Sequence, residues 1–340
     1  MTKTVLVTGG AGYIGSHTAI SLLERGHEVV IVDDLSNSSI KAVEAVRQLG
    51  GADIMFHEID MTDESALRPV FSNHPIEAVV HFAGLKAVGE SVLNPLAYYR
   101  TNLGSTINLL ALMEEHEVWD LVFSSSATVY GCSDILPIPE SAATGFANPY
   151  GHTKLIIEDV CRALAAADRR WRISLLRYFN PIGAHSSGDL GEDPLGEPNN
   201  LVPYVMQVAV GRRDRVQVFG SDWDTPDGTG VRDYIHVVDL ALGHLAALEH
   251  LDHGCDAFNL GTGNGSSVIE VIRTAEQVSG QSIPYDLVGR REGDVATSVA
   301  DPSKANQMLG WRADRNLEAM LHDAWNWQSR HPKGFSDQPG

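Results

Sequence analysis

The chain has 340 residues, 43% of them hydrophobic, and a formal net charge of −19 at pH 7. This charge argues against nucleic acid or an anionic membrane surface as a partner, and no apolar run is long enough to span a bilayer. The length allows a large core in two lobes, so we expect a soluble, cytoplasmic protein that binds neither nucleic acid nor membranes.

A glycine-rich turn follows the first predicted strand. The apolar, β-prone residues 4–7 lead into Gly10-x-Gly12-x-x-Gly15, which opens a segment with helical spacing. In this context the glycines allow a tight turn, the approach of backbone amides to a pyrophosphate, and close packing of helix on strand. The pyrophosphate would lie at the helix N-terminus, where free N–H groups and the helix dipole favour an anion. The turn therefore predicts a dinucleotide site.

The second predicted strand, residues 29–32, ends at Asp33. A carboxylate at this place can accept hydrogen bonds from both ribose hydroxyls of an adenosine and would repel a 2′-phosphate. The alternative is a glycine-rich turn that holds no ligand, and the agreement of strand, helix and Asp33 argues against it. The sequence therefore favours NAD over NADP.

Strands and helices alternate through the first half of the chain. This alternation is typical of βαβ units and predicts an α/β fold with a doubly wound parallel Rossmann sheet. Ligands of such sheets bind beyond the carboxyl ends of the strands. Residues at predicted strand ends are Gly9, Asp33, Asp60, Gly84 and Ser126. The further strands are expected over residues 53–57, 78–84, 121–126 and 173–179, and the helices over 41–49, 98–115 and 155–167.

The composition changes after Pro181 to loops rich in Gly, Pro and Asp, over residues 185–200 and 222–230. Loops of this length are typical of lids or binding segments. Residues 257–260 are expected to form a strand that returns to the main sheet. The predicted division is an NAD-binding Rossmann domain over 1–179, a smaller, interleaved, mainly substrate-binding C-terminal lobe over 180–334, whose segments around 232–262 return to the first domain, and a flexible tail over 335–340.

Tyr150 and Lys154 begin a helix-prone segment and, at positions i and i+4, share one helical face. An ammonium about 4 Å from a phenol is worth roughly 4 kcal/mol at an effective dielectric near 20, or about three pKa units. Tyr150 could then act as a base near neutral pH, and the positive nicotinamide of NAD⁺ would lower its pKa further. The alternative is a structural pair on a surface helix. Ser126 at a preceding strand end favours catalysis, because its hydroxyl can bind the same substrate oxygen.

The glycine-rich first turn, the serine and Tyr-x-x-x-Lys, in this order, resemble the extended short-chain dehydrogenase/reductase family. Longer motifs are similar to those of the UDP-glucose 4-epimerases within it, and the match runs from Val5 to about His331. These motifs are Phe82-Ala-Gly-Leu-Lys-Ala-Val-Gly-Glu-Ser91, Ser124-Ser-Ser-Ala-Thr-Val-Tyr-Gly131, Leu176-Arg-Tyr-Phe-Asn-Pro181 and Gly230-Val-Arg-Asp-Tyr-Ile-His-Val237.

The resemblance implies a reaction. Tyr150 would take the proton of the sugar 4-hydroxyl while a hydride leaves C4 for the nicotinamide, with Ser126 holding that oxygen and Lys154 tuning Tyr150 and binding the nicotinamide ribose. The 4-keto sugar would then turn about its diphosphate link and take the hydride back on its other face. NAD would thus stay tightly bound and be regenerated in each cycle, with UDP-glucose and UDP-galactose as substrates. The family also implies a homodimer packed through helices such as 98–115 and 155–167.

The same matching implies two sets of binding residues, within which Arg232 and Arg291 would supply planar donors for the diphosphate. The cofactor set is Gly9, Gly12, Tyr13, Ile14, Gly15, Asp33, Asp34, Leu35, Asn37, Ser38, Asp60, Met61, Phe82, Ala83, Gly84, Lys86, Thr101, Ser124, Tyr150, Lys154 and Tyr178. The set for the UDP-sugar is Lys86, Ser126, Tyr150, Phe179, Asn180, Asn200, Leu201, Phe219, Arg232, Tyr234, Arg291, Asp294 and Ser298.

Two positions depart from the commonest family pattern. Thr101 stands where the family usually has an asparagine against the cofactor, and we expect a modest loss because a hydroxyl can still donate. Ser298 stands where members restricted to UDP-glucose and UDP-galactose carry a bulky tyrosine beside the sugar. A serine leaves room for an N-acetyl group, so we predict that UDP-GlcNAc and UDP-GalNAc are also interconverted. The alternative is a pocket refilled by another side chain or by water.

Two other functions are compatible with the cofactor lobe. A nucleotide-sugar 4,6-dehydratase needs an additional acid/base pair, typically Asp-Glu after the strand-end serine or threonine, and here Ala127 and Thr128 follow Ser126. A non-catalytic NAD-sensing protein would not need Ser126, Tyr150 and Lys154 together.

The three cysteines are Cys132, Cys161 and Cys255. They show neither paired nor CxxC spacing, so the sequence predicts no disulfide framework and no metal site.

Overall fold

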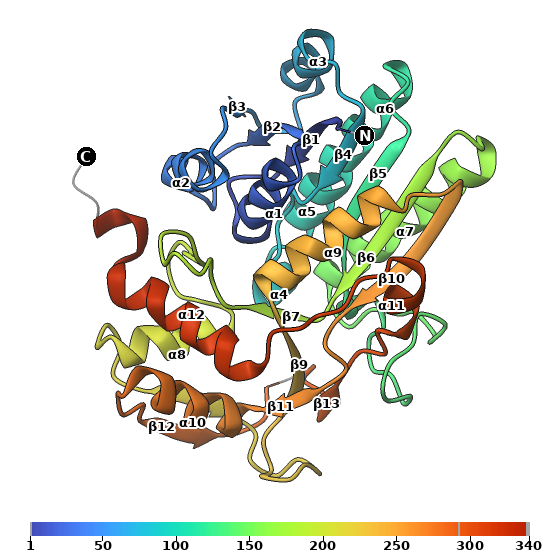
Figure 1. Cartoon of the computed structure of the whole chain (residues 1–340). Coiled ribbons are helices and arrows are strands. Elements are labelled where there is room, and N and C mark those ends of the chain that lie inside the picture. Colours follow the sequence, from blue (N-terminus) through green and yellow to red (C-terminus); the bar gives the residue numbers. More distant parts are fainter. Residues whose placement is uncertain (1, 292, 338–340) are drawn as a thin grey trace.

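The computed structural model describes residues 2–291 and 293–337. Within this part of the chain a central sheet is formed by β1 (Thr4–Thr8), β2 (Glu28–Asp33), β3 (Met55–Glu58), β4 (Ala78–His81), β5 (Asp120–Ser126), β6 (Arg172–Tyr178) and β10 (Gly254–Leu260). All neighbours are parallel, in the order β10-β6-β5-β4-β1-β2-β3 (Figure 1). The predicted α/β, doubly wound Rossmann sheet is therefore confirmed.

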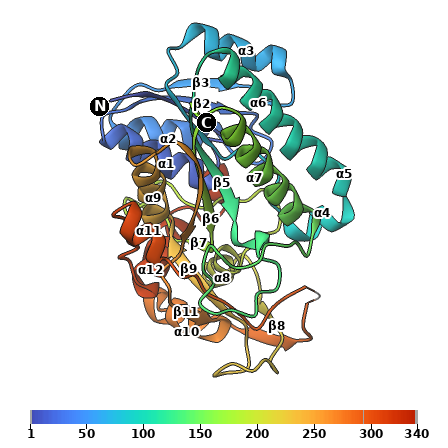
Figure 2. The same ribbon diagram turned by 90° about the vertical axis from the view of Figure 1, so that its right-hand side faces the viewer.

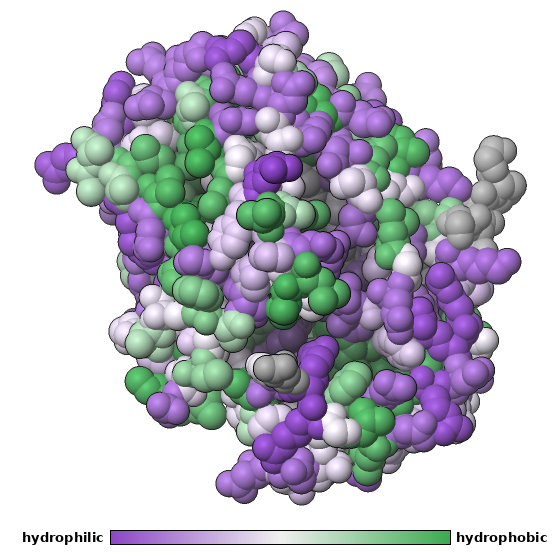
Figure 3. All heavy atoms as spheres, turned by 180° about the vertical axis from the view of Figure 1, so that it is seen from behind, coloured by the Kyte–Doolittle hydropathy of each residue, from purple (hydrophilic) through white to green (hydrophobic). Residues whose placement is uncertain are grey.

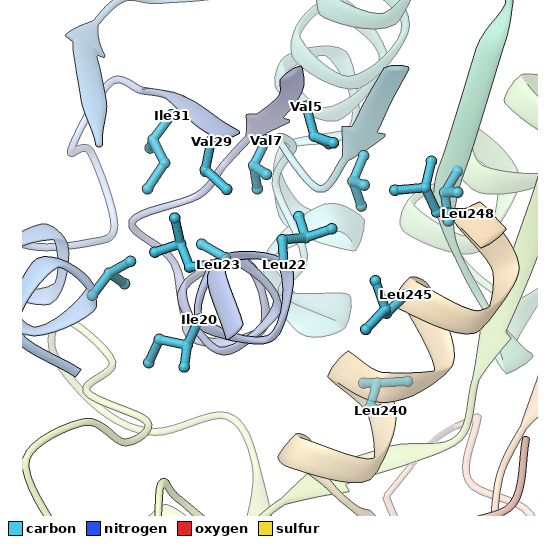
Figure 4. Packing of buried hydrophobic residues seen from close by; sticks show 14 of the residues in the cluster. Val5, Val7, Ile20, Leu22, Leu23, Val29, Ile31, Leu240, Leu245 and Leu248 are labelled. Carbon is cyan, nitrogen blue, oxygen red and sulfur yellow. The ribbon is translucent and has the colours of Figure 1, made fainter. Parts of the chain in front are cut away.

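Helices cover both faces of the sheet, because successive side chains of a buried parallel strand point to opposite faces. Val5 and Val7 of β1 belong to one hydrophobic cluster and Leu6 to another. The first cluster is covered by α1 (Tyr13–Glu24), α2 (Ile40–Gly50) and α9 (Val237–Glu249), and the second by α3 (Glu64–Asn73), α6 (Gly104–Glu115) and α7 (Pro149–Ala167). Figure 4 shows Val5, Val7, Val29 and Ile31 above Ile20, Leu22 and Leu23 of α1, beside Leu240, Leu245 and Leu248 of α9.

A smaller lobe lies at the carboxyl edge of the sheet (Figure 2). In it β9 (Val231–His236) pairs with β7 (Asn180–Ile182), β11 (Gly265–Ser267) and β13 (Thr297–Ser298), while β8 (Val216–Phe219) pairs with β12 (Tyr285–Val288). The third hydrophobic cluster joins these strands to α8 (Leu201–Ala209), α10 (Val268–Ser279) and α12 (Leu317–Arg330). A capping box between Ser267 and Glu270 begins α10. Shorter helices are α4 (Val88–Leu93), α5 (Pro95–Tyr98), α11 (Ser303–Met308), η2 (Ala127–Val129) and η3 (Gly334–Asp337).

The chain crosses between the two parts more than once. β10 follows α9 and pairs in parallel with β6, from Gly254 beside Arg172 to Leu260 beside Tyr178. Residues that come after the small lobe's β9 thus complete the edge of the central sheet. The division at residues 179 and 180 stays a prediction.

The helix predicted over residues 98–115 is not regular. Its beginning is the π-helical stretch η1 (Tyr99–Leu103), and α6 starts only at Gly104. The wider turn carries Asn102, which is buried and bonds the backbone of Leu85 through both its amide oxygen and its amide nitrogen. π-Helical turns often occur at functional sites.

The flexible tail over residues 335–340 stays a prediction, although its first residues take regular structure. Gly334–Asp337 form a 3₁₀ turn, η3, and Phe335 is only 8% exposed. Its ring centroid lies 4.9 Å from that of Trp327, so an aromatic contact with α12 orders this segment. The predicted tail residues 338–340 lie outside the described part of the chain.

No helix of the described residues combines the length and the apolar character needed to cross a membrane. In the same residues no three His, Cys, Asp or Glu side chains are grouped so that they could hold a metal ion.

Candidate active site

The turn between β1 and α1 can bind an anion. Gly9 adopts φ +66° and its N–H donates to the carbonyl of Val32 at 2.7 Å, which holds the turn against β2. A Cβ at Gly15 would collide with the carbonyl oxygen of Gly9, so this close approach requires glycine. Among the described residues no side chain caps α1 at Gly12, and no acidic residue lies in its first turn. The backbone N–H groups at the N-terminus of α1 therefore fit the pyrophosphate of NAD.

Asp33 ends β2 and organises the adjacent loop. Its carboxylate accepts from the N–H of Ala11 at 3.0 Å, the N–H of Leu35 at 3.0 Å and the hydroxyl of Ser38 at 2.7 Å. Burial raises the pKa of Asp33, and these three hydrogen bonds oppose that shift. Leu35 takes the left-handed conformation with φ 55°, a strain that is commonest at functional sites.

A pocket lies between this loop and the small lobe. Predicted cofactor residues line this pocket together with Glu192, which was not predicted from the sequence. The side chain of Glu192 is 8% exposed. Glu192 Oε1 accepts from Asn200 Nδ2 at 2.8 Å and lies 3.8 Å from Lys86 Nζ. Burial raises the pKa of Glu192. The pocket is lined by Ala11, Gly12, Tyr13, Ser16, Asn37, Ser38, Ser39, Ala42, Lys86, Gly191, Glu192, Asp193, Pro194 and Phe335.

The other predicted cofactor residues differ in exposure. Asp34 and Asp60 are exposed, and their carboxylates accept from the N–H groups of Ser36 at 3.0 Å and Thr62 at 2.8 Å. Tyr178 is buried and its hydroxyl contacts His244 Nε2. Met61 is buried, Ile14, Leu35, Phe82, Ala83 and Thr101 are half-buried, and Gly84 is exposed.

The three predicted catalytic residues meet beyond the carboxyl end of β5. Ser126 ends this strand, and Tyr150 and Lys154 lie in the first turns of α7. Lys154 is buried, its Nζ donates to the carbonyl of Ser124 at 2.6 Å, and this nitrogen lies 5.9 Å from the centroid of the Tyr150 ring. Ser126 Oγ accepts from the N–H of Thr128 at 3.2 Å and from its hydroxyl at 2.9 Å. The fold therefore places a hydroxyl, a phenol and an ammonium around one point.

The predicted lowering of the Tyr150 pKa is wrong for the protein by itself. Removal of the phenol from water raises the pKa of Tyr150 to about 12, and the hydrogen bond with Ser126 opposes this only in part. Burial also lowers the pKa of Lys154, to about 7, so its ammonium is a weaker source of positive charge than the sequence suggested. Spacing along a helix could not show that both side chains are buried.

A buried ion pair behind the catalytic residues was also missed. Glu158, one helical turn after Lys154, accepts from Arg177 Nε at 2.9 Å and from Nη2 at 2.7 Å. Its Oε1 also accepts from the hydroxyl of Ser125 at 2.6 Å. The side chains of Glu158 and Arg177 are 0% and 3% exposed. This network joins α7 to β5 and β6. The sequence held one indication of it, since Glu158 follows Lys154 by four residues and so lies on the same face of the helix.

The predicted residues for the UDP-sugar lie mainly in the small lobe. Arg232 of β9 and Arg291 both face Asp294, with nitrogen-to-oxygen distances of 3.9 Å and 3.0 Å. Arg291 also lies over the ring of Phe219, 5.5 Å from its centroid. Asn180 begins β7, Asn200 precedes α8 and Leu201 is its first residue. Two arginines from separate segments are thus brought together.

Three further predicted residues differ in their surroundings. Ser298 is half-buried and stands beside Arg232 in the register of β13 and β9. Tyr234 is packed in the hydrophobic cluster of the small lobe, and Phe179 in one with Val129 and Ala300. The structure therefore sets Ser298 beside Arg232 and gives Tyr234 and Phe179 mainly apolar neighbours.

Known proteins resemble this chain over nearly its whole length. The model of the NAD dependent epimerase/dehydratase family matches residues 5–261. UDP-glucose 4-epimerase of Bacillus subtilis (strain 168) is 56% identical over 333 residues, 97% of this chain and 98% of that protein. The Homo sapiens UDP-glucose 4-epimerase is 54% identical over 347 residues, 99% and 100% of the two chains. The crystal structure of UDP-glucose 4-epimerase from Bifidobacterium longum in complex with NAD+ and UDP has a TM-score of 0.95 at 54% identity, covering 98% of this chain and 100% of that chain.

Proposed function

The chain belongs to the NAD dependent epimerase/dehydratase family, and from this premise we propose that it interconverts UDP-glucose and UDP-galactose by inversion at C4 of the sugar. NAD is the cofactor. The observation that carries the proposal is the meeting of Ser126, Tyr150 and Lys154 at the end of β5. High identity to UDP-glucose 4-epimerases over almost the full length supports the choice of substrate.

Tyr150 and Ser126 each have a task that their surroundings allow. Bound NAD would supply the hydride acceptor, and then the hydride donor, for C4 of the sugar. Tyr150 takes the proton from the 4-hydroxyl and gives it back, as a general base and then a general acid. Its pKa of about 12 in the protein alone leaves the phenol protonated at neutral pH, so the positive charge of NAD⁺ is needed to lower it. Ser126 holds the reacting oxygen in place.

The small lobe would hold the nucleotide while the keto sugar turns. Arg232 and Arg291 present planar guanidinium groups that suit a diphosphate, and both face Asp294. An incoming diphosphate would compete with this carboxylate for the two arginines. A substrate held by its diphosphate is free to present either face of the sugar to the same catalytic residues.

Two alternative functions fit these surroundings less well. A 4,6-dehydratase needs a second acid/base pair after the strand-end hydroxyl, but Ser126 is followed by the 3₁₀ turn Ala127–Val129, in which the Thr128 hydroxyl donates to Ser126 Oγ at 2.9 Å. A protein that only senses NAD has no use for a serine, tyrosine and lysine gathered at one strand end.

Product analysis tests the proposed reaction. The purified protein is incubated separately with four UDP-sugars: UDP-glucose, UDP-galactose, UDP-GlcNAc and UDP-GalNAc. We expect the 4-epimer of each, without added NAD, and no dehydrated product. Denaturation of the same preparation should release NAD, because we propose that the cofactor stays bound through each cycle. A 4-keto-6-deoxy sugar would instead establish the dehydratase, and no product at all the sensor.

We also propose that the N-acetyl sugars are substrates. Ser298 is small and stands beside Arg232 in the sheet register, which sets it near the groups expected to hold the diphosphate. A tyrosine at this place would occupy the space of an N-acetyl group. Ser298→Tyr should therefore remove activity on UDP-GlcNAc and keep that on UDP-glucose, while Ser298→Ala, which keeps the space, should keep both. Activity of the unchanged protein on the hexoses alone would contradict the proposal.

A homodimer is the proposed assembly. Exposed apolar side chains gather on α4, α5 and α6, where Leu93 is 80% and Leu96 76% exposed, with Val92 and Ile107 also exposed. These helices lie along one side of the molecule (Figure 2), and a second copy would cover them. Figure 3 shows that the face opposite to Figure 1 carries hydrophobic patches among hydrophilic side chains.

Light scattering tests the assembly. It should give a dimer for the unchanged protein and a monomer for the double variant Leu93→Glu/Leu96→Glu. A monomer in both would refute the assembly.

A further inference from the structure

The C-terminal turn η3 reaches the cofactor pocket from the far end of the chain. Phe335 lines this pocket together with Gly12 and Ser38 on one side and Gly191 and Asp193 on the other. Gly12 and Ser38 belong to the elements expected to bind the pyrophosphate and the adenosine ribose. Residues 191–194 belong to the long loop that leaves β7. The pocket is therefore walled by three segments that are distant in the sequence.

The main chain of Phe335 connects the two sides of the pocket. Its N–H donates to Asp193 Oδ2 at 2.9 Å, and its carbonyl accepts from Lys41 Nζ at 2.8 Å. Lys41 lies in the first turn of α2, directly after the loop that carries Ser38. A Cβ at Gly334 would collide with the carboxylate of Asp193, so η3 lies in close contact with this side chain. Two charged side chains thus hold one residue from opposite directions.

Packing against α12 holds the same segments in place. The ring of Phe335 contacts that of Trp327, which is 3% exposed. Gly191 of the loop lies so close to this indole that a Cβ at Gly191 would collide with Trp327. Earlier in the loop, Asp189 pairs with Arg330 of α12 at 3.0 Å. Phe335 and the loop are therefore positioned by one helix.

The beginning of the loop is fixed to the cofactor side. The hydroxyl of Tyr13, the first residue of α1, donates to the carbonyl of Gly183 at 2.7 Å. The loop is consequently held by α1 at its start and by α12 and η3 near residue 193. The part of the loop between Gly183 and Asp193 is thus held at two places, and it moves away from the pocket only if one set of these contacts breaks.

We propose that η3 and residues 191–194 are part of the cofactor site and set how slowly NAD leaves it. The inference rests on the proposed function, in which NAD is a resident cofactor. The phosphate turn and Asp33 supply the groups that bind the dinucleotide. The Lys41–Phe335–Asp193 connection closes the side of the pocket through which the pyrophosphate would depart. Release then requires this connection to break, so weakening it speeds release.

The rate of NAD exchange tests this role without relying on catalysis. Protein loaded with isotopically labelled NAD is mixed with excess unlabelled NAD, and the label that remains bound is followed in time. Lys41→Met removes the donor to Phe335 and keeps the length of the side chain. We expect release to become about tenfold faster, because hydrogen bonds to charged groups are stronger than neutral ones. Phe335→Ala, which removes the contact with Trp327, should accelerate release as well.

A matched control separates this effect from a general loss of stability. Lys304 also donates to a backbone carbonyl, that of Ala257 at 2.9 Å, but lies on α11 away from the pocket. Lys304→Met should leave the release rate unchanged. Equal release rates in the unchanged, Lys41→Met and Phe335→Ala proteins would overturn the inference while leaving the epimerase intact. Faster release in a protein that epimerises no UDP-sugar would uphold the inference and refute the proposed function.

Discussion

The two sides of the cofactor pocket are built in different ways. On one side β1, the glycine turn, α1 and β2 follow one another in the chain, and their backbone geometry supplies the N–H groups for the pyrophosphate. On the other side Asp193 and Phe335 meet across 142 residues and hold each other through a hydrogen bond. A local motif thus determines which ligand is bound, and long-range packing determines how firmly the site is closed.

The catalytic end of the sheet shows a similar contrast. Tyr150 and Lys154 are local neighbours on α7, but burial shifts the pKa of both, and Ser126 of β5 opposes the shift at Tyr150. Behind them the buried pair of Glu158 and Arg177 joins α7 to β6. The following substitutions separate local chemistry from long-range support.

The largest effect is expected at the catalytic phenol. Tyr150→Phe removes the group that moves the proton, so kcat should fall by roughly 10² to 10⁴-fold, whereas the NAD content of the purified protein should not change. Tyr99→Phe is the control, because this neighbouring phenol bonds His152 Nδ1 at 2.7 Å rather than Ser126. A Tyr150→Phe protein with near-normal kcat would show that another group moves the proton.

The next largest effect concerns the local side of the pocket. In Gly15→Ala the new Cβ meets the carbonyl oxygen of Gly9, and overpacking of this kind should weaken NAD binding by about tenfold to a hundredfold. Gly104→Ala is a control, since nothing lies within 4 Å of a Cβ there. Equilibrium binding of NAD to the two glycine variants measures the loss of affinity. Normal affinity in Gly15→Ala would contradict the close packing of the turn.

Removal of the buried charge behind the active site should destabilise the protein. Glu158→Gln leaves the guanidinium of Arg177 without its charged partner, and we expect the free energy of unfolding to fall by about 3 to 5 kcal/mol. Asp159→Asn, whose side chain is 69% exposed and pairs with Arg162, should have little effect. Urea unfolding compares the two variants. Equal stability of both would mean that the buried pair does not support α7.

The smallest expected effect is a pH dependence of stability. The pKa of Lys154 is lowered from 10.5 in the unfolded chain to about 7 in the folded protein, so the unfolded state binds more protons between these values. Stability contributed by this group therefore rises as pH increases through this window and is lost as pH falls towards 7. In the NAD-free protein Lys154→Met should be more stable than the unchanged protein by about 2 kcal/mol at pH 7. The difference should shrink as pH approaches 10.5, and a difference independent of pH would contradict the buried ammonium.

The parts that could be predicted from the sequence are those in which neighbouring residues act together. The phosphate turn and Asp33 lie on the consecutive elements β1, α1 and β2, and Tyr150 and Lys154 share one helix, α7, so spacing within each segment indicated their place. The sheet followed from the same alternation of strands and helices. The π-helical stretch around Asn102 was not predicted, because the spacing of residues 98–115 was interpreted as one regular helix.

The remaining features depend on contacts between distant segments. Phe335 was assigned to a flexible tail because its neighbours are polar or small, and only the position of Trp327 shows that its ring is covered. Glu192 lies in a loop that was expected to be a lid or a binding segment. Its contacts with Lys86 and Asn200 could not be predicted from the sequence. The pKa of Tyr150 was predicted from a single charge, whereas burial dominates it.

We propose that a resident NAD accepts a hydride from C4 of the sugar and returns it to the same carbon. UDP-glucose deuterated at C4 is incubated in ordinary water with the purified protein and no added NAD, and the UDP-galactose formed is analysed by NMR. The account predicts that the product keeps its deuterium at C4. Loss of the deuterium to solvent, or a requirement for added NAD in every turnover, would contradict it.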